Sequence, residues 1–374
     1  MEKTIGRRIT DFLSTGPLRV ALLFITPVAG FFALRWSVNF MRDPDANKLL
    51  VGLVALIVGI FGVWALFLLT DAIVSRLPEG WRERVRPYVF VGPSIIILTA
   101  YLIYPTINTI FLSLRAGRGD SWANAQSPFG LPLDNYLFIF SDPSMLDTLR
   151  NNIFWLVGVT GVTVSLGLVI AVMVDRIKLE SLAKSIIFLP MAISAVGASV
   201  IWKFIYNFKA PGTPQNGLLN AVWVALGNNP VGWLVENKPW NNFFLIIILI
   251  WLLTGFAMVV LSAAVKGVPA ELLEAARMDG ATEIRIFFSV IVPHIQGSII
   301  TITTTIVIMV LKVFDIVFVM TNGQFDTQVI ANRMYSEMFT YRNFGRGSAI
   351  AVLLLVAVLP IMISNIRSFN KARN

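Results

Sequence analysis

Long apolar segments recur along almost the whole chain, and they restrict the folds that it can adopt. A helix needs about 20 mainly apolar residues to cross the roughly 30 Å of hydrocarbon in a bilayer. Because only helices and closed barrels satisfy their backbone groups in lipid, segments of this length predict an all-α polytopic membrane protein with about eight transmembrane helices. The predicted spans cover residues 18–36, 49–70, 88–114, 152–174, 185–206, 242–264, 297–320 and 347–366. The first is the weakest, since Pro27 interrupts it.

The composition agrees with a membrane protein and excludes two other classes. Hydrophobic residues make up 56% of the chain and charged residues 14%, whereas about 25% are charged in soluble domains. The net charge of +9 comes from basic residues spread between the spans, which argues against a nucleic-acid-binding surface. The chain has no cysteine, so neither disulfides nor thiol chemistry are expected.

The distribution of basic residues predicts the orientation of the chain. With an even number of spans both termini lie on one side, and Lys and Arg residues are more numerous in the segments that a cytoplasmic N-terminus places inside. The positive-inside rule therefore predicts that both termini are cytoplasmic. Tryptophans near predicted span ends are expected to be interfacial anchors, namely Trp36, Trp155, Trp202 and Trp240.

A polar segment, residues 265–296, separates two of the predicted spans and should form two short helices. Pro269 suits the first position of a helix, and Glu271 then lies near the positive end of its dipole. Gly280 can adopt left-handed dihedral angles and so end this helix. A second helix is predicted from Thr282 to Phe288, and the predicted orientation places the whole segment in the cytoplasm.

The same segment resembles the coupling motif of the membrane subunits of ABC importers. Glu-Ala-Ala at 274–276 is followed after three residues by Gly280, and after nine more residues by Val-Ile-Val-Pro at 290–293. The family usually has Ile and Leu where this chain has Val290 and Val292. The resemblance implies that this coupling loop contacts a separate ATPase, through Glu274, Ala275, Ala276, Gly280 and Pro293.

The resemblance extends over the six spans from residue 88 onwards. Leu-Ile-Tyr-Pro at 102–105, Asp-Asn-Tyr at 134–136 and Asn151-Asn152 are similar to the core of maltose-type carbohydrate permeases. We therefore expect an N-terminal extension with two spans over residues 1–87 and a six-helix core of the type I importer fold over residues 88–374.

The resemblance also implies partners. Gly227 and Gly232 carry no phosphate-binding Lys after them, so this chain is not expected to bind ATP. No cofactor is expected on this chain, and ATP would act through two cytoplasmic ATP-binding subunits. A second permease subunit, forming a heterodimer, and an extracytoplasmic sugar-binding protein complete the implied assembly in the inner membrane. The long loops 115–150 and 207–241 are candidate docking surfaces for that binding protein.

Two charged residues inside a predicted span need an explanation. Lys312 and Asp315 are three residues apart, so on one helix they would share a face and could pair. Intramembrane charges usually face a bundle interior or a cavity, so either a sugar path or a structural ion pair fits. The surrounding residues resemble the α-glucoside branch of these permeases, which adds Phe314 and Asn322 to the candidate substrate path.

Two other functional classes compete with an ABC permease. A polytopic membrane enzyme would need converging catalytic or metal-binding groups, and the single histidine, His294, has no companion ligand in the sequence. No catalytic residue and no metal site are predicted. A secondary transporter would show inverted repeats with paired broken helices, which the sequence does not display. Neither alternative accounts for the coupling loop.

Overall fold

The computed structural model describes Gly30, Phe32 and residues 35–74, 79–117, 121–122, 133–175, 177–236 and 239–373. The chain divides into two compact units, Met1–Pro105 and Thr106–Asn374. The boundary predicted between residues 87 and 88 stays a prediction. The predicted span 18–36 lies almost entirely outside the described residues.

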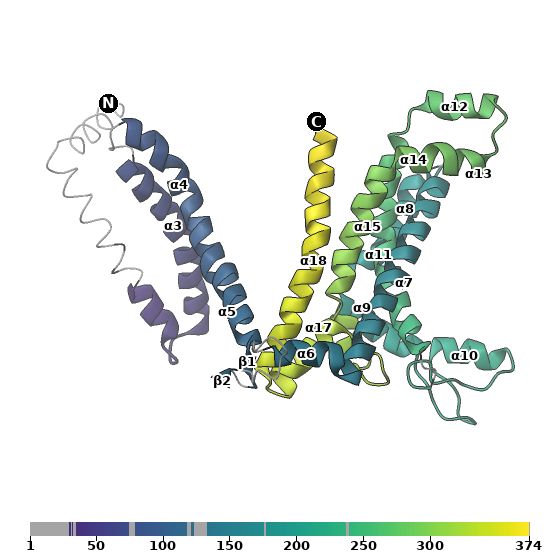
Figure 1. The fold of residues 1–374 in the computed structure, drawn as a ribbon, viewed down its shortest axis with the longest axis horizontal. Coiled ribbons are helices and arrows are strands. Elements are labelled where there is room, and N and C mark those ends of the chain that lie inside the picture. The colour runs from purple at the N-terminus through teal and green to yellow at the C-terminus, as the bar shows by residue number, and fades with distance from the viewer. Residues whose placement is uncertain are drawn as a thin grey trace. The chain divides into compact units, whose positions relative to one another are not determined.

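Helices dominate both units (Figure 1). The first unit contains α3 (Lys48–Val74), α4 (Glu79–Leu98) and a π-helical turn (Thr99–Ile103). The next helix, α5 (Tyr104–Ser113), begins two residues before the boundary, so most of it belongs to the second unit. A two-residue hairpin follows, in which β1 (Arg115–Ala116) pairs antiparallel with β2 (Ser121–Trp122).

The hairpin belongs to the second unit, and so do all the remaining elements. They are α6 (Asp134–Ser141), α7 (Pro143–Val174), α8 (Glu180–Phe188), a 3-10 turn (Leu189–Ala192), α9 (Ala195–Ile205), α10 (Leu218–Ala225), α11 (Asn241–Lys266), α12 (Ala270–Met278), α13 (Glu283–Ile286), a π-helical turn (Phe287–Ile291), α14 (Val292–His294), α15 (Gln296–Leu311), α16 (Asp315–Met320), α17 (Ile330–Tyr335), a π-helical turn (Ser336–Thr340) and α18 (Phe344–Arg373).

Four helical segments of the described chain are long and apolar enough to cross a membrane: Phe90–Ser113, Pro143–Val174, Asn241–Lys266 and Phe344–Ile363. Two bent pairs raise the number to six if each pair is one span. The predicted span 49–70 falls on α3, where Lys48–Gly62 is a shorter apolar helix. The all-α polytopic fold is therefore confirmed.

Two spans predicted as continuous helices are interrupted. The segment predicted over 185–206 bends by 97° between α8 with its 3-10 turn and α9. Pro190 removes a backbone donor there, and the Ser194 side chain accepts a hydrogen bond from the Gly197 N–H (3.0 Å), which starts a new helix. The segment predicted over 297–320 ends at Leu311 and resumes at Asp315, so it is also two helices.

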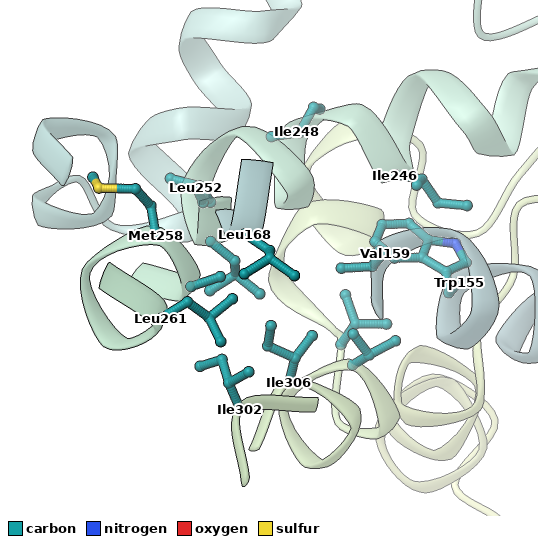
Figure 2. Close-up of a cluster of buried hydrophobic side chains, with 14 of the residues drawn as sticks. Trp155, Val159, Leu168, Ile246, Ile248, Leu252, Met258, Leu261, Ile302 and Ile306 are labelled. Atoms are coloured by element: carbon teal, nitrogen blue, oxygen red, sulfur yellow. The ribbon is translucent and has the colours of Figure 1, made fainter. Parts of the chain in front are cut away.

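The core of the second unit lies where α7, α11 and α15 pack together (Figure 2). The helix α7 begins at Pro143, preceded by Asp142, whose carboxylate accepts hydrogen bonds from the Ser144 and Met145 N–H groups. A hydrogen bond from the Ser144 hydroxyl, together with these two backbone bonds, holds the pKa of Asp142 below its usual range. The cluster contains Val159, Leu168, Leu252, Leu261, Ile302 and Ile306.

One predicted interfacial anchor is instead a core residue. Trp155 is fully buried in the core (Figure 2). Its indole N–H donates to the Asn242 side chain at 3.4 Å. An indole can be buried when its N–H finds such a partner. Trp36 and Trp240 are 63% exposed, as interfacial positions require.

The second unit has two distinct ends (Figure 1). At one, called here the α12 end, lie α12, α13 and the C-terminal end of α18. At the other, the α10 end, lie α6, α10 and α17. The long helices α7, α11 and α15 run between these ends, so the coupling loop and the long loop 207–241 are on opposite sides of the spans.

Candidate coupling and substrate-path sites

The predicted helix–turn–helix is present at the α12 end. The helix α11 ends at Lys266, and the chain crosses Gly267, Val268 and Pro269 before α12 begins at Ala270. Pro269 is thus the cap residue, and the helix begins one position later than predicted. Val268 is buried and fixes the start of the loop against the core. Glu271 lies in the first turn, as predicted.

Gly280 ends α12 in the expected left-handed conformation, with φ of +77°. Its N–H donates to the Arg277 carbonyl at 3.0 Å, and the Ala281 N–H donates to the Ala276 carbonyl at 3.0 Å. This pair of bonds is the Schellman arrangement, which satisfies carbonyls at the end of a helix. The turn is therefore defined by backbone geometry at one glycine.

The second short helix begins with its own cap. The Thr282 hydroxyl accepts a hydrogen bond from the Arg285 N–H at 3.3 Å. The regular helix is shorter than predicted, Glu283–Ile286, and continues as a π-helical turn to Ile291. An ion pair between Arg277 Nε and Glu283 Oε1 (3.0 Å) connects the two helices. Both side chains are half-exposed, so this pair contributes little by itself.

The faces of α12 differ in environment. Leu273 and Ala276 pack against the core, whereas Glu274, Ala275 and Gly280 are exposed. Ala276 thus packs toward the core, whereas the side chain of Ala275 is exposed and accessible to a partner protein. Met278 is 87% exposed, a large apolar side chain on a protruding helix. Pro293 lies in α14 and is also exposed.

A network of charged groups holds the base of the coupling loop. The Lys184 ammonium is 2.5 Å from an Asp175 oxygen and 2.6 Å from a Glu180 oxygen. Glu180 also pairs with Lys266, the last residue of α11, and Ser262 donates to Asp175 at 2.7 Å. The network joins the ends of α7, α8 and α11 directly below the loop. The sequence analysis missed it because Ser262 and Lys266 lie 78 to 87 residues from their partners in the network, a separation that local spacing does not reveal.

The candidate substrate-path residues do not form one cluster. Lys312 is the C-terminal cap of α15, Phe314 is the cap residue before α16, and Asp315 is the first residue of α16. Lys312 and Asp315 therefore do not share a helix face, and the ion pairs found among the described residues do not include them. Of the two alternatives for these charges, the ion pair is therefore not formed in the described part of the chain, and the sugar path stays a prediction. Asn322 lies further along, beyond α16.

Lys312 and Phe314 line an apolar cavity of about 500 Å³ between α15, α17 and α18. Tyr335 of α17 also lines this cavity. Its ring centroid is 5.3 Å from that of Phe314 and 5.3 Å from that of Phe318. The Phe314 and Phe318 rings are stacked at 5.0 Å. The cavity thus has an aromatic wall and one cationic side chain at its rim.

Asn322 lines a different, polar cavity of about 310 Å³ at the α10 end. Arg333 of α17 contributes a cation, which pairs with Glu337 at 2.9 Å. Its Nε is buried without a hydrogen-bond partner. Other lining groups are hydroxyl, amide and carboxylate side chains: Ser144, Asp147, Asn151, Gln324, Asp326, Gln328, Ser336 and Thr340. Since α17 lines both cavities, one helix connects the polar cavity to the aromatic one.

The loop 321–329, which forms part of the polar cavity, is held by asparagines at the starts of α7 and α11. Asn151 donates to the Asp326 carbonyl at 2.6 Å, and Asn241 donates to the Phe325 carbonyl at 2.6 Å. Asn152 accepts from the Ile330 N–H at 2.7 Å. These bonds sustain an unusual backbone, in which Asn322, Phe325 and Asp326 all have positive φ. Such conformations persist only where the surroundings fix them.

The fold and these sites define a class: a polytopic membrane transport subunit with a protruding, exposed helix at one end and a polar cavity at the other. The family profile described as "Binding-protein-dependent transport system inner membrane component" matches residues 163–369. The chain belongs to this family, the permease subunits of ABC importers, and is a multi-pass protein of the inner membrane.

Two curated relatives agree. An osmoprotective compounds uptake permease protein from Synechocystis sp. is 57% identical over 281 residues, which cover 75% of this chain and 98% of that protein. An alpha-glucoside transport system permease protein from Rhizobium meliloti is 49% identical over 285 residues, covering 76% of this chain and 82% of that protein.

The fold also matches a solved structure. A chain in the crystal structure of a bacterial ABC transporter involved in the import of the acidic polysaccharide alginate superimposes with a TM-score of 0.62. It covers 78% of this chain and 99% of that chain, at 20% sequence identity. At this identity the likeness supports the fold and not the substrate.

Proposed function

We propose that this chain forms half of the translocation path of an ATP-driven importer for an α-glucoside or a related sugar. The observation that carries the transport role is the exposed helix α12, with Glu274 and Ala275 facing outward on a loop fixed by Gly280. The substrate class rests on the alpha-glucoside relative, 49% identical over most of its length. The two cavities lined by α17 support a path for a molecule with hydroxyl groups and apolar ring faces.

The proposal includes the partners and the orientation. A second permease subunit would complete the path as a heterodimer, and two separate ATP-binding subunits would contact α12 from the cytoplasm. ATP acts through those subunits, because this chain carries no Gly-rich loop with a phosphate-binding Lys. With the α12 end cytoplasmic, the C-terminus is cytoplasmic too, and the polar cavity faces the extracytoplasmic binding protein.

In this scheme Glu274 transmits the closure of the ATPase. Among the ion pairs of the described residues it takes part in none, and it is exposed, so its carboxylate is available to a basic group on the ATPase. A hydrogen bond to a charged group contributes roughly 1.5–3 kcal/mol. The neighbouring Ala275 has only a methyl group as its side chain, which allows the surface of the ATPase to approach the helix closely.

The test is Glu274→Ala in the complete importer, reconstituted with its binding protein and sugar. We expect sugar-stimulated ATP hydrolysis and α-glucoside uptake to fall roughly ten-fold or more, in line with the loss of a charged hydrogen bond. The matched control is Lys178→Ala, an exposed charge near the same end but outside the coupling loop. Unchanged coupling in Glu274→Ala would contradict the role of this residue.

The substrate and the class of transporter are tested by separate experiments. A cysteine at position 275 of this naturally cysteine-free chain should crosslink to the ATPase subunit, whatever the sugar. Uptake of an α-glucoside is then measured beside unrelated sugars. A crosslink without α-glucoside uptake would overturn the substrate, whereas no crosslink in an assembled complex would overturn the coupling assignment.

A further inference from the structure

We infer that α10 is an interfacial helix, whose outward apolar face lies in the headgroup–acyl boundary of the outer leaflet beside the spans. This inference concerns the lipid bilayer as the partner of α10, and it does not depend on the proposed substrate. It rests on the composition of α10, on the contacts that fix its rotation, and on its position at the ends of the spans.

The helix α10 has no charged side chain and one polar side chain, Asn220. Asn220 is fully buried, whereas the outward side chains are apolar and open. Leu218 is 62% exposed, Val222 is 52% exposed and Leu226, just after the helix, is 71% exposed. Residues spaced by four lie on one side of a helix. These three residues, called here the α10 stripe, form a continuous apolar strip.

Contacts on the opposite side prevent α10 from turning the stripe inward. The Asn220 amide donates to the Asn207 carbonyl (3.1 Å) and to the Val231 carbonyl (3.0 Å), and it accepts from the Val231 N–H (2.9 Å). Trp223 stacks edge-on against Trp233 at 5.7 Å, and Trp233 in turn contacts Phe244 of α11 at 5.2 Å. The helix is thus fixed to the bundle with its apolar strip outward.

The position of α10 matches the surface of a bilayer. Figure 1 shows α10 running across the direction of α7 and α11 at the end of the bundle. The helix α11 has 26 residues, more than the about 20 needed to cross the hydrocarbon. Its ends therefore reach headgroup level, and α10 is joined to the first turn of α11 through Trp223, Trp233 and Phe244, which places α10 at the same level. Neighbouring span ends carry open apolar residues, Phe204 at 70% and Trp240 at 63% exposure, so the stripe continues a lipid-facing surface.

The flanking residues suit lipid better than a protein partner. Lys203 and Lys209 are exposed on either side of the break after α9 and can reach lipid phosphates. The acidic Glu236 accepts a bond from the Gly232 N–H within the same loop. A protein interface would bring a polar rim around the apolar centre, and α10 itself offers none. Aromatic and basic residues beside an apolar strip are typical of an interfacial helix.

The experiment uses the assembled importer in lipid nanodiscs, without the binding protein. An environment-sensitive fluorophore is attached at Val222→Cys, and a matched control is labelled at Thr213→Cys, an exposed position in the adjoining loop. Lipids carrying a nitroxide near the headgroup serve as quenchers. We expect blue-shifted emission and strong quenching at position 222, and neither effect at position 213.

Three results would overturn the inference. Emission at position 222 equal to that at position 213 would mean that the stripe faces water. Blue-shifted emission without quenching by lipid would mean that another subunit covers it. The third result concerns the variant Leu218→Ser/Leu226→Ser labelled at position 222. If the lipid quencher still quenches this label equally well, the contact with lipid lies elsewhere. Loss of quenching in the assembled complex would instead support the stripe as the contact.

Discussion

At the scale of single residues, Gly280 determines the direction of the coupling loop. Its φ of +77° is strained for a residue with a side chain, yet nothing lies within 4 Å of the position that a Cβ would occupy. The requirement for glycine is therefore conformational and not steric. The sequence contained this information, because a glycine after an apolar-periodic helix predicts a left-handed end.

We predict that Gly280→Val impairs coupling far more than Gly280→Asn. A left-handed conformation costs an ordinary L-residue roughly 1–2 kcal/mol, whereas Asn adopts it more readily. Because nothing lies within 4 Å of the position that a Cβ would occupy, a steric clash at that atom does not affect the comparison between the Val and Asn variants. Sugar-stimulated ATP hydrolysis, corrected for the amount of assembled complex, is the measurement. Equal loss in both variants would show that side-chain volume matters instead.

Contacts between distant residues were the part of the site that the sequence did not reveal. Arg333 and Tyr335 each line a cavity, but isolated Arg and Tyr residues have no pattern that distinguishes such a role. Asn151 and Asn152 did stand out through the family resemblance. Their function, bonding a loop more than 170 residues away, depends on tertiary structure that local spacing does not encode.

At the scale of elements, the break between α15 and α16 explains the two charges in an apolar run. Lys312 caps the negative end of α15, and Asp315 lies in the first turn at the positive end of α16. Each charge thus suits its own helix dipole. Buried Val310, Val313 and Ile316 hold the broken segment in the core. With neither Pro nor Gly at the break, periodicity alone indicated one continuous span.

We predict that the effects of Lys312→Met and Asp315→Leu on stability are nearly additive. Each substitution removes one favourable interaction between a charge and a helix dipole, which contributes roughly 0.3–1 kcal/mol at a helix end. An ion pair would instead couple them, and the double variant would then recover stability. Thermal unfolding of the purified complex for both single variants and the double variant gives the interaction energy. An interaction energy between the two substitutions well above about 0.5 kcal/mol would instead support an ion pair.

At the scale of the whole molecule, apolar length predicted the six spans from residue 88 onwards, four as long helices and two as bent pairs, but it did not predict all of their bends. Pro190 offered a signal for the bend before α9, since proline removes a backbone donor. The 74° bend before α15, at Ile295, has a weaker one, Pro293 two residues earlier. The side of the membrane that each end occupies is predicted from the distribution of basic residues.

We predict that the two ends of the second unit are labelled from opposite sides of the membrane. Because the chain has no cysteine, Ala275→Cys and Thr213→Cys each introduce a single thiol, and both positions are exposed. A membrane-impermeant maleimide added to intact cells should label position 213 and not position 275. After the membrane is opened, both should react. Labelling of position 275 in intact cells would reverse the orientation.

The asparagine-held loop at the α10 end has a mechanical consequence. Because amide side chains of α7 and α11 join that loop, the loop ties the two helices together at this end, and we expect it to act as a fulcrum about which α11 tilts as a rigid arm. An arm of 26 residues is about 39 Å long at 1.5 Å per residue. A tilt of about 10° about the fulcrum would therefore carry the far end of α11, and α12 with it, through about 7 Å. Conversely, a displacement of α12 by a partner protein would tilt α11 about the same point.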